Sequence, residues 1–321
     1  MTNDARPIDR AAKCFDNSLE WRAIRDAKGI VEPPPAFNEP VEYRGVRQQV
    51  DMPIGAMPLK ITITIICCLV AASLHVPGTA RAQAGPPFLT NDPGTPGNAN
   101  WEINLASMQS IAHGVSSYQV PQIDLNYGLG ERFQLTYEIP YVLQDRSGQP
   151  MQSGWSNGYP GVKWRFLDQG EDGWHLSTFP QVEIAGPPHA RQVEIAAPAP
   201  RYLVPLEVAK KIGVFHVDFE AGYYFRGRGP KERILGLVAG RPVTERLELD
   251  AEFYDDRPYE ATPYSTTLDV GGRFKLQPGV IALFMAGRSI NGLSEGQPEF
   301  FGYFGVQILL SNYGRMLSSE P

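Results

Sequence analysis

Residues 214–226 read VFHVDFEAGYYFR, and the character of the side chains alternates along this stretch. Odd positions from Phe215 to Phe225 are apolar or aromatic, whereas even positions from His216 to Gly222 are polar or small. Successive side chains of a β-strand point to opposite faces, so alternation over such a length predicts a strand with one apolar and one polar face. Helical spacing does not fit this pattern.

Two further stretches, 133–144 and 246–256, alternate in the same way. Extending this reading along the chain predicts about twelve strands. Their expected spans are 101–111, 117–129, 132–145, 157–169, 173–186, 201–212, 214–226, 233–244, 246–256, 265–277, 280–291 and 299–310. Most are long enough to cross a bilayer at a tilt, for which about 9–11 residues are needed. Short and long connections alternate between them, as in outer-membrane barrels.

Composition excludes several other classes of protein. The 321 residues include 29 Lys and Arg against 35 Asp and Glu. This acidic balance does not indicate the excess of positive charge that is typical of nucleic-acid-binding proteins. Three cysteines, two of them adjacent, are too few for a disulfide framework or a zinc site of the CxxC type. A polytopic helical membrane protein would need several apolar runs of about 20 residues, and the chain has one long run.

Charged residues occur deep inside the expected strands. In a soluble sandwich they would form the solvated outer faces, whereas in a membrane barrel they would line a wet lumen. Strand length and an export signal favour the barrel, so we expect an all-β, antiparallel transmembrane barrel of about 12 strands over residues 101–310. The candidate lumen-lining residues are Glu138, Lys163, Arg165, Asp218, Glu220, Glu248, Asp250, Glu252, Arg273 and Lys275. The basic members would either face the acidic ones across the lumen or pair with neighbouring strands.

Residues 57–84 have the order of a secretory signal peptide. Lys60 precedes an apolar core at 61–74, and two overlapping A-x-A sites end at Ala82 and Ala84. A transmembrane anchor is the alternative, but the run is short and is followed by Pro77 and Gly78. Residues 1–56 would then be a mis-assigned start or a disordered extension. We expect residues 85–100 to be a periplasmic N-terminal segment and residues 311–321 a periplasmic tail.

The expected mature start carries a recognisable motif. Residues 85–93 read GPPFLTNDP, the pair Trp101–Glu102 follows, and residues 158–164 read GYPGVKW. This arrangement resembles a bacterial outer-membrane family named for the meta-pathway of phenol degradation, whose members are often described as transporters. Asn91 stands where the family pattern has an acidic residue. The resemblance implies a barrel in the Gram-negative envelope.

These observations leave three functions open. The first is a porin-like passive channel or transporter for small, aromatic or hydrophobic solutes, and the second is a structural outer-membrane barrel with a plugged lumen. The third is a lipid hydrolase, because the spacing of His175 and Ser177 resembles that of the histidine and the nucleophilic serine of outer-membrane phospholipase A. Their strand face points to the lumen rather than to lipid, so we expect no enzyme.

The sequence also sets expectations about ligands and partners. No cofactor motif appears, and the histidines are too scattered in sequence to predict a metal site. The expected partners are membrane lipids, lipopolysaccharide, the barrel-assembly machinery and an unidentified small solute, with no nucleic acid.

Overall fold

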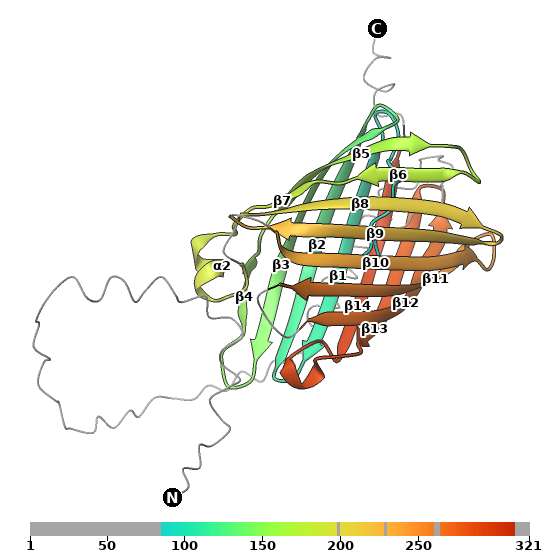
Figure 1. Ribbon diagram of the computed structural model, residues 1–321. Helices are drawn as coiled ribbons and strands as arrows, with labels where there is room; N and C mark the ends of the chain where they lie inside the picture. Colours follow the sequence, from blue (N-terminus) through green and yellow to red (C-terminus); the bar gives the residue numbers. More distant parts are fainter. Residues whose placement is uncertain (1–84, 198–199, 228–229, 260–263, 312–321) are drawn as a thin grey trace, which may run out of the picture. The chain divides into compact units, whose positions relative to one another are not determined.

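The computed structural model describes residues 85–197, 200–227, 230–259 and 264–311. The expected extension at 1–56, the expected signal peptide at 57–84 and the tail beyond Ser311 lie outside the described residues. In the part that is described, the chain is almost entirely β-structure (Figure 1).

One antiparallel sheet contains all the described strands and closes on itself (Figure 1). The strands are β1 (Trp101–Ala112), β2 (Val115–Leu129), β3 (Phe133–Arg146), β4 (Gln152–Trp155), β5 (Tyr159–Asp168), β6 (Trp174–Thr178), β7 (Gln181–Glu183), β8 (Arg201–Ile212), β9 (Phe215–Phe225), β10 (Pro230–Pro242), β11 (Leu247–Pro258), β12 (Ser265–Gln277), β13 (Val280–Ser289) and β14 (Phe300–Leu310). The pairing of β1 with β14 joins the two ends of the barrel sequence, from Trp101 opposite Leu310 to Ile111 opposite Phe300.

The fourteen strand segments occupy twelve positions around the barrel. Both β4 and β5 pair with β3, so they are successive parts of one strand position. Likewise β6 and β7 both pair with β5 and β8. The prediction of an all-β, twelve-stranded antiparallel barrel is therefore confirmed.

The connections differ at the two rims. At one rim the hairpins are tight, as at Gly213 between β8 and β9, where φ is +63° and glycine avoids the strain that a Cβ would cause. At the other rim the connections are longer and include the helices α2 (Pro188–Gln192) and η2 (Leu293–Glu295). Ala190 of α2 packs with Ile195 and Val142, on the inner face of β3.

The two faces of the barrel wall have opposite character. Phe219, Leu249 and Val270 point outward and are 36%, 43% and 65% exposed, while their neighbours Glu220 and Asp250 are buried inside. A soluble protein would bury the apolar face, since large exposed apolar surfaces are unstable in water. An apolar exterior around a charged interior is instead the surface of a membrane-spanning barrel.

No helix among the described residues is long and apolar enough to cross a membrane.

Candidate functional site: the barrel lumen

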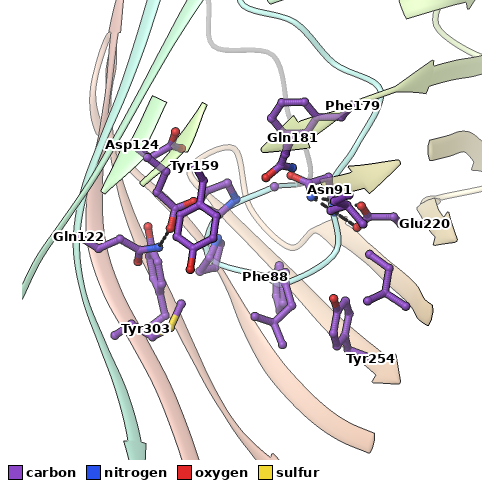
Figure 2. A pocket seen from close by; sticks show the side chains of 18 of the residues that line it. Phe88, Asn91, Gln122, Asp124, Tyr159, Phe179, Gln181, Glu220, Tyr254 and Tyr303 are labelled. Atoms are coloured by element: carbon purple, nitrogen blue, oxygen red, sulfur yellow. Dashed lines mark hydrogen bonds between the residues drawn. The ribbon is translucent and has the colours of Figure 1, made fainter. Parts of the chain in front are cut away.

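Residues 85–94, which precede β1, lie inside the barrel (Figure 2). They run between the inner faces of strands on opposite sides and contact both, before residues 95–100 lead to Trp101 at the rim of tight hairpins. We call residues 85–94 the lumen segment. Residues 85–100 are expected to be a periplasmic N-terminal segment, and bonds between its main chain and charged side chains of the wall hold residues 85–94 within the barrel.

Two glutamates of the wall accept hydrogen bonds from the N–H groups of the lumen segment. Glu252 of β11 accepts from Leu89 N at 3.1 Å and from Thr90 N at 2.6 Å. Glu220 of β9 accepts from Asn91 N at 2.8 Å (Figure 2). Buried main-chain groups must find partners, and a segment outside any strand pairing cannot find them in a sheet. The carboxylate oxygens therefore take the place of the C=O groups that a neighbouring strand would supply.

Two basic side chains bond to carbonyl groups of the same segment. Lys163 of β5 donates to Asp92 O, and Arg273 of β12 donates to Gly85 O at 3.2 Å and Pro86 O at 3.0 Å. Acidic residues thus hold the N–H groups and basic residues hold the C=O groups. The bonds come from well-separated strands, so they fix the segment across the lumen rather than along one wall.

Packing holds the segment at two further points. Thr90 is fully buried against Gly236 of β10, where an added Cβ would lie 2.2 Å from Thr90 Oγ1. Glycine lets the segment approach the wall closely here, because a side chain at this position would press against Thr90. Phe88 is buried in an apolar cluster of the inner wall that includes Leu283 and Met285 of β13.

A cavity of about 470 Å³ remains beside the segment. Aromatic and polar side chains share its lining, as Figure 2 shows for Tyr159, Phe179, Gln181, Tyr254 and Tyr303. Cavities of about 300–1,000 Å³ with a few placed polar groups are typical of small-molecule sites. The lumen thus combines a bonded inner segment with a space of ligand size.

The ten candidate residues from the sequence differ in what they contact. Four of them hold the lumen segment: Lys163, Glu220, Glu252 and Arg273.

The remaining six occupy other positions. Glu138 lines the cavity and accepts from Gln122 Nε2 at 2.6 Å. Arg165 donates to Glu131 O at 2.7 Å. Lys275 is exposed near the end of β12, away from the segment. The other three, which are buried inside β9 and β11, are Asp218, Glu248 and Asp250.

Two ion pairs between basic and acidic residues run along the barrel wall, one between neighbouring strands and one across a single strand position. Arg273 lies opposite Glu248 in the β11–β12 register, with Nη1 3.6 Å from Glu248 Oε1, so this pair joins neighbouring strands. Lys163 Nζ lies 3.5 Å from Glu207 Oε2 on β8, across the position that β6 occupies.

Sequence reasoning missed Glu207 as a member of the lumen. Its alternation with Leu206 and Val208 was the available signal, since all three fall in an expected strand. It also missed the buried Glu102 and Asp124.

The structure separates the two residues of the hydrolase hypothesis. Ser177 is fully buried and donates its hydroxyl hydrogen bond to Glu207. His175 instead lies with Nδ1 3.2 Å from Asp168 Oδ1. In the part of the chain that the structure describes, each of the two residues therefore contacts a carboxylate, Ser177 that of Glu207 and His175 that of Asp168.

The chain matches no protein-family model and no curated protein. Solved structures with a similar fold include the KdgM porin, with 11% identity and a TM-score of 0.46 over 64% of this chain and 98% of that chain. An outer membrane channel from Pseudomonas putida F1 gives 14% identity and a TM-score of 0.48 over 71% and 100% of the two chains. The NanC porin gives 6% and 0.45 over 65% and 100%.

Proposed function

We propose that the protein is an outer-membrane channel for small solutes, in which the lumen segment forms the constriction. The observation that supports this most is the cavity of about 470 Å³ between the segment and the barrel wall. Twelve strands enclose a narrow interior, because barrel diameter grows with strand number. A segment within it limits passage to solutes small enough to move through the remaining space. This role includes no catalytic step.

We further propose that the solutes are aromatic or hydrophobic compounds with a few polar groups. Phe88 and Phe179 line the cavity together with several tyrosines, whose rings offer apolar contact and whose hydroxyl groups offer hydrogen bonds. Gln122 and Gln181 supply amide groups on the same lining. Such a lining suits a flat ring with polar substituents better than a long, strongly hydrated sugar.

A structural barrel with a plugged lumen is the second candidate. The bonds from Glu220, Glu252, Lys163 and Arg273 to the segment favour it, because together they hold the main chain at both ends and in the middle. The two proposals differ in one respect, namely whether solute passes while the segment is bound.

The cellular setting proposed for either function follows from the sequence. Residues 57–84 would direct export and be removed, and the barrel-assembly machinery would insert the mature chain. Lipopolysaccharide and other membrane lipids would contact its exterior. We also propose, from the resemblance of the motif at 85–93, that the chain is a member of the family named for the meta-pathway of phenol degradation, in which the motif would form the lumen segment.

Liposome swelling tests the channel proposal. The purified protein is folded into liposomes, and swelling is followed after addition of phenylalanine, a monosaccharide or a hexasaccharide. We expect phenylalanine to enter faster than the monosaccharide and the hexasaccharide to be excluded, since the free space is about 470 Å³. Liposomes without protein are the control. Absence of swelling with every solute would favour the plugged structural barrel, and equal rates for the two small solutes would contradict an aromatic preference.

A further inference from the structure

Three potential metal ligands meet on the inner face of the barrel near the rim of tight hairpins. His216 lies at the start of β9, and Glu248 and Asp250 lie at the start of β11. His216 Nε2 is 3.0 Å from Asp250 Oδ1 and 3.5 Å from Glu248 Oε1. One ligand atom from each residue lies within 4.8 Å of the other two.

A glycine on the intervening strand makes this meeting possible. Gly240 of β10 lies opposite both His216 and Asp250 in the sheet register. A Cβ built at Gly240 would lie 1.7 Å from Asp250 Oδ1, so the carboxylate of Asp250 occupies the space that a side chain at position 240 would need. Without a side chain at this position, residues from two strands that are not direct neighbours can approach each other.

Burial leaves the carboxylate of Asp250 incompletely paired. Its side chain is 0% exposed, and its Oδ2 has no hydrogen-bond partner among the residues that the structure describes. The buried Asp218, two residues beyond His216 on the same face, also has an oxygen without such a partner. A buried carboxylate oxygen without a partner is costly, and a bound cation would remove that cost.

A positive group also lies near the cluster. Arg273 Nη1 is 3.6 Å from Glu248 Oε1, beyond hydrogen-bond distance, while its Nη2 bonds to the lumen segment. The guanidinium therefore does not occupy the space between His216 and Asp250. Lys275 also acts electrostatically on Glu248, and the three carboxylates of Asp218, Glu248 and Asp250 outnumber these two cations, which leaves the cluster suited to a further cation.

We propose that His216 Nε2, Glu248 and Asp250 bind one divalent metal ion of the zinc class. Ligand atoms about 2.0–2.1 Å from a tetrahedral zinc ion lie roughly 3.3 Å from one another. The separations of 3.0 and 3.5 Å from Nε2 to the two carboxylates are close to that value. An imidazole ligand favours zinc and similar ions over Mg²⁺ and Ca²⁺, which take oxygen ligands. Three protein ligands leave a fourth position for water or solute.

The proposed metal site is independent of the channel proposal, although the two share a neighbour. Glu248 would contact both the ion and Arg273. Arg273 in turn donates hydrogen bonds to Gly85 O and Pro86 O of the lumen segment. An ion at this position would therefore lie next to one anchor of the segment.

Metal titration of the full chain, folded in detergent and first treated with chelator, tests the proposal. Calorimetry with Zn²⁺ should show one ion per chain, and Co²⁺ should give the visible absorption of a tetrahedral site. His216→Ala and Asp250→Asn should each weaken Zn²⁺ binding by more than about 100-fold, because loss of a ligand exceeds the 10–100-fold effect of an outer partner. Gly240→Ala should also weaken it by displacing the carboxylate.

His175→Ala is the matched control, since His175 is 24% exposed against 25% for His216 and also lies beside a carboxylate. It should leave Zn²⁺ binding unchanged. The proposal would be overturned by the absence of one tight Zn²⁺ per chain, by unchanged binding in His216→Ala, or by equal loss in the control. Tighter binding of Ca²⁺ than of Zn²⁺ would also overturn it, because it would indicate an acidic cluster only.

Discussion

Replacing Glu220 and Glu252 together by alanine should raise the single-channel conductance of the protein severalfold. These two carboxylates accept three main-chain hydrogen bonds from Leu89, Thr90 and Asn91, and Glu220 also accepts from the side-chain amide of Asn91 at 3.3 Å. Each hydrogen bond to a charged group contributes about 1.5–3 kcal/mol, so their joint loss should free the middle of the lumen segment. Conductance is measured in planar bilayers, with far-UV circular dichroism to check that the barrel has folded.

The double variant also removes two negative charges, which alone would change ion flow. Glu183→Ala with Asp255→Ala is the matched control, because both residues are buried carboxylates that accept hydrogen bonds from side chains of Asn157 and Thr266 and are not part of the cavity lining. It should leave the conductance close to that of the wild type. An equal rise in both double variants would mean that charge, rather than the lumen segment, limits the current.

Phe219→Arg should destabilise the barrel by about 2–4 kcal/mol, the cost of a cation near the middle of the bilayer on a lipid-facing position. Phe219 lies mid-strand on β9, with its side chain outward between Leu237 and Val208 on the neighbouring strands. Urea unfolding in lipid vesicles, followed by tryptophan fluorescence, measures the free energy of unfolding.

The control for this substitution must face the lumen without holding the segment. Glu220→Arg would not serve, because Glu220 is fully buried and accepts a hydrogen bond from Asn91 N, so the substitution would also release the lumen segment. Gln181→Arg is the better control, because Gln181 lines the cavity. A cost for Gln181→Arg equal to that for Phe219→Arg would contradict the assignment of the two faces.

Alternation along the chain was sufficient to predict the barrel. The expected strand at 265–277 has the same bounds as β12, and the expected strand at 246–256 differs from β11 by one or two residues at each end. The expected strand at 173–186 is instead divided into β6 and β7. Phe179 and Pro180 lie between them, and proline cannot donate to a strand ladder. The alternation of apolar and polar residues indicates which face of a strand is apolar, but it does not predict where a strand is interrupted.

The lumen segment could not be predicted from the same signal. Residues 85–94 have no periodicity, and their partners are distant in sequence, since Glu252 follows Leu89 by 163 positions. The metal cluster is hidden for the same reason, since His216 and Asp250 meet only because the barrel places β9 and β11 on either side of Gly240. Polar positions in a strand identify the lumen, but closure of the sheet decides which of them meet.

Disulfide cross-linking of the lumen segment to the wall tests the central claim most directly. Thr90 Cβ lies 3.0 Å from the Cβ expected for a side chain at Gly236, and disulfides need about 3.5–4.5 Å, so a shift of under about 1 Å suffices. Thr90→Cys and Gly236→Cys are combined in the full chain, whose three native cysteines all precede residue 85 and would be removed with the signal peptide. Each single-cysteine variant serves as a control. We predict near-complete cross-linking in intact membranes after mild oxidation, whereas two thiols that react with a small alkylating reagent but form no disulfide would contradict the account.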